Sequence, residues 1–139
     1  MEAKKNMLEG IKVVDLSRNL AAPFCTMILA DLGAEVIKVE SPKGDDARTY
    51  GPFINGKSGY FMSINRGKKS VTLDLKNPDD KAKLAELLKD ADVMVDNFRP
   101  GVLDRMGITE EWVSSINPRV IFTSVTGFGQ TGPYRTKAA

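Results

Sequence analysis

The sequence contains no histidine, and this absence excludes several classes of site. Without an imidazole, the 139 residues hold no histidine-based acid, base, catalytic triad or zinc site. The single cysteine, Cys25, cannot form a disulfide within the chain, which fits a reducing compartment. We therefore expect a cytoplasmic protein whose hydrophobic core needs neither a metal nor a disulfide.

Charge of one sign and long apolar runs are also missing. The chain has 20 Lys and Arg against 18 Asp and Glu, a net charge of +2, so no overall field favours a nucleic-acid partner. No apolar run reaches the roughly 18 residues of a membrane span, so we expect no membrane partner. With 42% hydrophobic and 27% charged residues, the composition is that of one globular domain over residues 1–139.

Strands and helices alternate along the chain. Short β-branched runs predict strands at 11–15, 35–40, 70–75, 92–96 and 119–126. Helical spacing and capping residues predict helices at 23–32, 78–91 and 109–117, with a helical turn or two within 101–107. This order indicates an α/β fold of Rossmann type, with a mostly parallel sheet and flanking helices.

The helix predicted at 23–32 carries most of its large apolar side chains on one face. Those at helical spacing are Phe24, Met27, Ile28 and Leu32. Cys25 lies in the first turn, where the helix dipole lowers a thiol pKa. Because the chain has no histidine to act as its base, we expect Cys25 to be a small core residue.

Two glycine-rich segments interrupt this pattern. Residues at about 41–60 lack periodicity and gather glycine and proline, which predicts a long surface loop. Gly127, Gly129 and Gly132 follow the last predicted strand with the GxGxxG spacing of a dinucleotide-binding loop. Because Pro133 follows at once and the sequence ends before the expected acidic residue, we interpret this segment as a glycine-rich turn.

Polar residues follow several predicted strands, where ligands gather in open α/β sheets. Asp15 and Asp96 each close a strand, and each is a candidate nucleophile or base, although surface or turn-capping aspartates are commoner. Asn97 to Gly101 (NFRPG), followed by Arg105, offers an amide, an aromatic ring and cations to a long ligand with anionic groups. A solvated loop with ordinary surface cations explains these residues equally well.

Several ordered blocks of the sequence resemble one known family. They are LEGIKVVDLSRNLAAPFCTMILADLGAEVIKVESPKGDDAR, SINRGKKSVTLDLK, ADVMVDNFRPGVLDRMGI and INPRVIFTSVTGFGQTGPY. Together they resemble the class III coenzyme A transferases, a family that includes formyl-CoA and carnitine-CoA transferases and the α-methylacyl-CoA racemases. The resemblance implies the N-terminal part of the family's large CoA-binding domain, in a protein that forms an interlocked homodimer.

The resemblance also implies positions for acyl-CoA. Asn19, Leu20 and Ala21 would lie beside the thioester, and Leu73 and Lys76 beside the adenosine. The other implied CoA contacts are Asn97 and Phe98 at the pantetheine arm, Arg105 at a phosphate with Met106 packed nearby, and Lys137 as a further cation. The catalytic aspartate of the family is expected beyond Ala139, so we assign no catalytic residue to this chain.

Three functions stay open at this point. The first is an acyl-CoA transferase, which moves CoA between a thioester and a carboxylic acid through an aspartyl-CoA intermediate. The second is a racemase of the α-methylacyl-CoA type. The third is a non-catalytic module that binds CoA or a nucleotide. Each predicts CoA or a related small molecule as the ligand, and none requires a metal.

Overall fold

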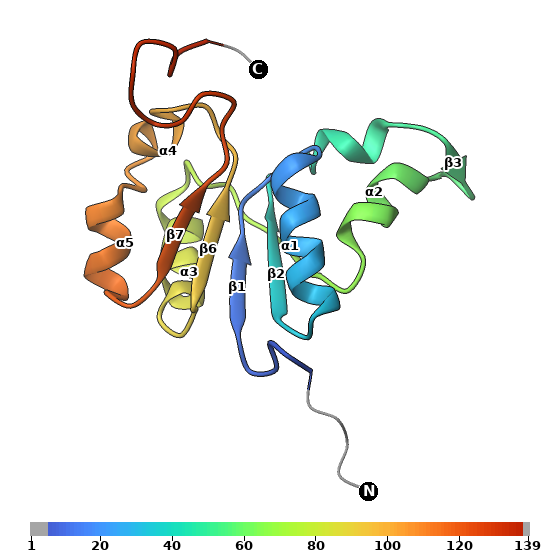
Figure 1. The fold of residues 1–139 in the computed structure, drawn as a ribbon, viewed down its shortest axis with the longest axis horizontal. Helices are drawn as coiled ribbons and strands as arrows, with labels where there is room; N and C mark the ends of the chain where they lie inside the picture. Colours follow the sequence, from blue (N-terminus) through green and yellow to red (C-terminus); the bar gives the residue numbers. More distant parts are fainter. Residues whose placement is uncertain (1–5, 138–139) are drawn as a thin grey trace, which may run out of the picture.

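Five parallel strands form the centre of the structure, a computed structural model that describes residues 6–137 (Figure 1). The strands are β1 (Lys12–Asp15), β2 (Glu35–Glu40), β5 (Lys69–Thr72), β6 (Val93–Asp96) and β7 (Ile121–Ser124). Their order in the sheet is β5-β2-β1-β6-β7, and every neighbouring pair is parallel. The predicted α/β class with a mostly parallel sheet is confirmed.

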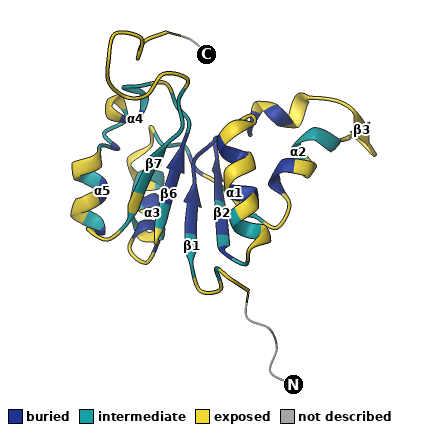
Figure 2. Ribbon diagram, in the orientation of Figure 1, coloured by how far each residue is buried: buried dark blue, intermediate teal, exposed yellow. Residues whose placement is uncertain are grey.

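Helices cover both faces of this sheet. On one face, α1 (Ala21–Asp31) packs over a cluster that includes Val13 and Val95. On the other face, α3 (Pro78–Leu88) and α5 (Glu110–Ile116) pack over Val14 and Met94. Neighbouring residues of β1 and of β6 therefore contribute to opposite cores, as the alternation of side chains along a strand requires. Figure 2 shows the central strands as the most buried part of the molecule.

Local sequence explains where the helices begin and end. The Asn77 side chain caps α3 by accepting a hydrogen bond of 2.9 Å from the Asp79 amide, and Thr109 caps α5 through the Trp112 amide at 3.1 Å. Gly33 ends the turn after α1 with a φ of 102°, a conformation that favours glycine. The single helical turn α4 (Val102–Arg105) lies within the predicted segment 101–107.

The predicted strands at 70–75 and 119–126 are shortened to four residues each. Each shortened strand has only one neighbour in the sheet, and its ladder stops where that neighbour ends. Thr72 pairs with Glu40, the last residue of β2, and Ser124 pairs with Asp96, the last residue of β6. The point at which each of these edge strands ends is thus set by its partner, which the edge sequence alone does not specify.

Helix α1 differs most from its prediction. It begins at Ala21, two residues before Pro23, and buries Ala22, Pro23, Thr26 and Met27. The side chains of Phe24, Ile28 and Leu32 are exposed, and so is Cys25. The prediction that Cys25 belongs to the core was therefore wrong, because α1 turns its mostly small residues toward the sheet.

The segment at about 41–60 was predicted to be one long surface loop, but the structure shows regular elements within it. It contains a short 3-10 helix η1 (Asp46–Thr49), a hairpin of β3 (Phe53–Ile54) and β4 (Lys57–Ser58), and the start of α2 (Gly59–Asn65). Ser58 joins these pieces, since its hydroxyl donates to the Ala47 carbonyl (2.9 Å) and accepts from the Phe61 amide (3.0 Å). The segment is ordered by side-chain hydrogen bonds rather than by an apolar repeat.

Within residues 6–137, none of the helices combines the length and the apolar character that crossing a bilayer would need.

Candidate functional site

The candidate site lies at the carboxyl ends of the strands, where the sheet order changes direction. After β1 the chain continues to β2 on one side, whereas β6 and β7 lie on the other. In doubly wound sheets such a switch point leaves a crevice in which ligands bind. Here the loop after β6 crosses to the loop after β1. The Asn97 amide accepts from the Arg18 N–H at 2.8 Å and donates to the Arg18 carbonyl at 2.7 Å.

Three neighbouring clefts occupy this edge. The switch-point cleft, of about 470 Å³, lies between residues 19–21, residues 97–100 and the chain after β7. The second, which we call the β2–β5 cleft, measures about 440 Å³ and lies between residues 39–43 and 73–76. The third, the α4 cleft of about 400 Å³, is lined by Lys76, Val102, Arg105 and Met106.

Shared residues connect the three clefts into one row. Phe98 lines both the switch-point cleft and the β2–β5 cleft, while Lys76 and Met106 line both the β2–β5 cleft and the α4 cleft. All the positions predicted for CoA lie in this row: Asn19, Leu20, Ala21, Leu73, Lys76, Asn97, Phe98, Arg105, Met106 and Lys137. The fold thus brings them to one edge, and their role in binding stays a prediction.

Cationic side chains line each of the three clefts, and two of these cations lie over aromatic rings. The Arg18 guanidinium lies over the Phe98 ring at 5.0 Å from its centroid, and the Lys137 ammonium lies over Tyr134 at 4.0 Å. Lys43 lines the β2–β5 cleft, and Arg135 lines the switch-point cleft. Such walls suit a ligand with phosphate groups, since arginine and lysine bind phosphate oxygens.

Three of these cations, Arg18, Lys43 and Arg135, were not predicted from the sequence. Arg18 and Lys43 each come three residues after the last residue of a strand, β1 and β2 respectively. A search of the three residues that follow each predicted strand would have found both. Arg135 lies in the turns after the glycine loop and has no comparable sequence signal.

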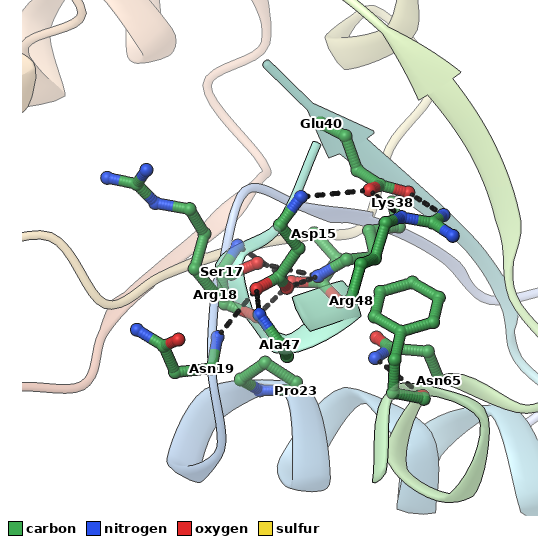
Figure 3. A network of polar contacts seen from close by, with 12 residues as sticks. Asp15, Ser17, Arg18, Asn19, Pro23, Lys38, Glu40, Ala47, Arg48 and Asn65 are labelled. Atoms are coloured by element: carbon green, nitrogen blue, oxygen red, sulfur yellow. Dashed lines mark hydrogen bonds and ion pairs between the residues drawn. The ribbon is translucent and has the colours of Figure 1, made fainter. Parts of the chain in front are cut away.

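Asp15 is buried in a network that leaves no space for a reactant. Its carboxylate forms an ion pair of 3.0 Å with Lys68 and accepts from the Thr26 hydroxyl at 2.6 Å. It also accepts from the amide and hydroxyl of Ser17, so it caps the turn after β1 (Figure 3). Burial lowers the pKa of Lys68, and the neighbouring carboxylate opposes that change. Asp15 is thus a turn-capping residue, although it is not on the surface.

Asp96 is also a buried turn cap, but it has a different environment. It accepts hydrogen bonds from the Phe98 amide at 2.9 Å and from the Ser124 hydroxyl. Burial raises the pKa of its carboxyl, an effect that these two donors partly offset. Asp96 and Ser124 line a fourth cleft of about 370 Å³, which contains only Phe98 among the predicted CoA positions.

The glycine loop does not form a dinucleotide-binding turn. Residues from Gly127 to Lys137 form bends and turns, and no helix begins at Gly132. A dinucleotide site needs that helix, because its N-terminus receives the pyrophosphate. The interpretation of this segment as a glycine-rich turn is confirmed. Its chain instead forms one wall of the switch-point cleft.

Comparisons with known proteins agree with this architecture. An acetyl-CoA:oxalate CoA-transferase from Acetobacter aceti is 52% identical over 130 residues, covering 93% of this chain and 33% of that protein. The human succinyl-CoA:glutarate CoA-transferase is 50% identical over 133 residues, covering 94% of this chain and 30% of that protein. The chain therefore spans about a third of the length of these curated relatives.

The solved structures extend the likeness to three dimensions. The crystal structure of a CAIB/BAIF family protein from Brucella suis matches with a TM-score of 0.90 and 46% identity, covering 96% of this chain and 36% of that one. The family described as CoA-transferase family III matches residues 8–139. With the sheet, the row of clefts and these matches together, the chain belongs to CoA-transferase family III.

Proposed function

We propose that this chain provides part of the CoA site of an acyl-CoA transferase. The observation that carries the proposal is the row of three connected clefts, whose walls contain every residue that the family resemblance assigns to CoA. A CoA molecule is long, with phosphates at one end and a thioester at the other. Its adenosine would occupy the β2–β5 and α4 clefts beside Lys76 and Arg105, and its thioester the switch-point cleft beside Asn19.

The proposed reaction transfers CoA through two covalent intermediates. A carboxylate, expected from an aspartate beyond Ala139, attacks the thioester carbonyl and releases the CoA thiolate, which leaves a mixed anhydride. The thiolate then attacks the aspartyl carbonyl, releasing the donor acid and forming aspartyl-CoA. An acceptor carboxylate repeats the sequence in reverse, which regenerates the aspartate and yields the new acyl-CoA. This chain contributes binding and orientation.

The names of the relatives favour transfer over the alternatives. The similar proteins from Acetobacter aceti and human are both CoA-transferases, whereas no observation on the chain favours a racemase. A non-catalytic CoA module would use the same clefts and differs only in lacking turnover. The cytoplasmic location and the interlocked homodimer stay predictions from composition and from the resemblance.

Calorimetric titration of the chain with CoA tests the assignment of the site. We expect weak binding, and Arg105→Ala should weaken it about tenfold, since a charge-assisted hydrogen bond to phosphate contributes about 1.5 to 3 kcal/mol. Arg119→Ala is the matched control. That arginine is also exposed, but it precedes β7 and so lies at the opposite edge of the sheet.

Two results would count against the proposal in different ways. Equal affinity of the wild type and Arg105→Ala would remove Arg105 from the site while leaving CoA binding intact. No heat of binding in the wild type at millimolar CoA would contradict a CoA site in this chain. An equal loss in the Arg119→Ala control would reveal a general effect of charge.

A further inference from the structure

The loop that leads from β1 into α1 is held by side chains from other parts of the chain. The Lys38 ammonium donates to the Ser17 carbonyl at 2.7 Å (Figure 3). The Asp45 carboxylate accepts from the Asn19 N–H at 3.1 Å. Between them, Asn97 binds both backbone groups of Arg18. Three consecutive residues therefore have their backbone fixed from β2, from the segment before η1 and from the loop after β6.

Lys38 and Asp45 also form an ion pair that is almost completely buried. Their charged atoms are 2.9 Å apart, and the side chains are 1% and 0% exposed. Removing two charges from water is costly, and apolar residues often replace such a pair without loss of stability. The pair therefore does more for the geometry of this loop than a hydrophobic pair would, because only polar atoms can bind the Ser17 carbonyl and the Asn19 amide.

Asn19 has an uncommon backbone conformation. Its φ is 65°, in the left-handed region that few residues other than glycine adopt and that asparagine adopts more readily than most. The next residue, Leu20, precedes α1 without any side-chain cap. Asn19, Leu20 and Ala21 line the switch-point cleft, so the shape of that cleft depends on this turn.

We propose that Asp45 is a positioning residue, which holds residues 19–21 in the geometry that receives the thioester end of acyl-CoA, with Lys38 as its buried counter-ion. The inference rests on the proposed function, because the thioester is assigned to the switch-point cleft there. The pair itself faces the loop backbone and not the clefts, since neither residue lines any of them. It acts on the ligand only through the loop.

Two double variants isolate the Asp45 hydrogen bond from the buried charges. Lys38→Met/Asp45→Asn removes both charges and keeps an oxygen that can accept from the Asn19 amide. Lys38→Met/Asp45→Ala removes the same charges and that acceptor, which also caps η1 by accepting from the Ala47 amide at 3.0 Å. Asn117→Ala is the control, because it deletes two buried hydrogen bonds, to the carbonyls of Leu88 and Ala91, before β7 at the opposite edge of the sheet.

The first measurement is amide hydrogen exchange at Asn19, followed by NMR, which needs no ligand. Loss of the acceptor in the alanine double variant should speed exchange at Asn19 about tenfold or more relative to the asparagine double variant, the factor expected for one buried hydrogen bond. The asparagine variant should stay within about threefold of the wild type, since its acceptor is retained. In the Asn117→Ala control, the exchange rate at Asn19 divided by the rates of the β1 amides should equal the wild-type ratio.

The second measurement compares two probes, acetyl-CoA and adenosine 3′,5′-bisphosphate. The alanine double variant should bind acetyl-CoA about tenfold more weakly than the asparagine double variant, with an unchanged affinity for the adenosine probe. Equal losses for both probes would indicate general destabilisation and overturn the positioning role. An unchanged acetyl-CoA affinity despite faster exchange at Asn19 would overturn it too.

The design separates this inference from the proposed function. If the wild type binds neither probe, the proposed CoA site fails, and exchange at Asn19 still decides whether Asp45 fixes the loop. If the alanine double variant does not fold, the asparagine double variant alone remains a test. Loss of Asn19 protection in that variant, which keeps the acceptor, would contradict the proposal.

Discussion

At the scale of single residues, Glu40 illustrates how a buried carboxylate is kept ionised beside the β2–β5 cleft. Burial alone would raise its pKa, but the Arg48 guanidinium binds both carboxylate oxygens at 2.7 Å. The Ser70 hydroxyl adds a further hydrogen bond of 2.6 Å. These donors and the charge of Arg48 outweigh burial and lower the pKa of Glu40 to about 2.

This pKa predicts how Arg48 contributes to stability. A carboxylate whose pKa is lower in the folded state stabilises it above its unfolded pKa of about 4.3, and that contribution is lost as the pH falls toward about 2. Arg48→Met should lower the free energy of unfolding by about 1 to 3 kcal/mol at pH 7, because Arg48 is half exposed and its charge is partly screened. Urea unfolding at pH 7, 4 and 2.5 should show the difference shrinking with acid.

The control for this prediction is Arg66→Met. Arg66 also binds a carboxylate through two hydrogen bonds, but it and its partner Asp31 are both exposed. Exposed pairs contribute little, so this variant should change stability by less than about 1 kcal/mol at any pH. A loss at Arg48 that does not vary with pH would assign its role to packing on Phe61, whose ring lies 3.8 Å away, instead of to Glu40.

Some residue roles were predictable from sequence and others were not. The caps at Asn77 and Thr109 follow from local spacing, because the donor lies within three residues. The buried pairs of Lys38 with Asp45 and of Lys68 with Asp15 depend on the folded arrangement of separate segments. In β2 the alternation of the strand places Lys38 and Glu40 inward, and only their distant partners explain that burial.

At the scale of secondary structure, α1 shows where an apolar pattern misleads. Its large apolar side chains are at helical spacing, yet Phe24 and Ile28 are 49% and 42% exposed while Met27 is 4% exposed. Three of the four buried residues of α1, namely Ala22, Pro23 and Thr26, are small, and small side chains let a helix lie close to a sheet. Helical periodicity shows that a helix has an apolar face. It does not identify which face packs against the sheet when apolar residues lie on more than one side.

Substitutions in α1 should therefore have unequal effects on stability. Met27→Ala removes a buried side chain and should cost about 2 to 4 kcal/mol. Ile28→Ala, at the adjacent and largely exposed position, should cost less than about 1 kcal/mol. Denaturant unfolding of the two variants compares them directly. Similar losses at both positions would mean that Ile28 is as buried as Met27 in solution.

At the scale of the whole molecule, the parallel direction of the strands was the most predictable property behind the candidate site. Alternating strands and helices indicate parallel strands, and the carboxyl ends of parallel strands meet at one edge. That is why Asn19, Lys76 and Asn97, far apart in sequence, line one row of clefts. The segment at about 41–60 was missed because its order comes from side-chain hydrogen bonds such as those of Ser58.

We proposed that this chain binds and orients CoA and that the nucleophile lies elsewhere in the protein. That proposal predicts how the chain alone behaves. Purified 139-residue protein should bind CoA but show no turnover with the acyl donor and acceptor pairs named for its relatives. The reason is that the attacking aspartate is expected beyond Ala139. A coupled assay for new acyl-CoA, with a longer relative as the positive control, measures this.

Detectable turnover would place the nucleophile within the chain. Asp96 would then be the first residue to replace with asparagine, because it lines a cleft and burial raises its pKa. Asp15→Asn would serve as the comparison, since its carboxylate is fully engaged by Lys68, Thr26 and Ser17.

The contact between Asn97 and the backbone of Arg18 joins segments 79 positions apart, at the boundary between the two halves of the sheet. A ligand bound there touches both halves at once, so it binds only while they are docked. Ligand occupancy is then linked to global unfolding, and a concentration one hundred times Kd would add about 2.7 kcal/mol to the folded state. Melting temperature would thus serve as a titration readout, rising with the logarithm of ligand concentration for any molecule that spans this boundary.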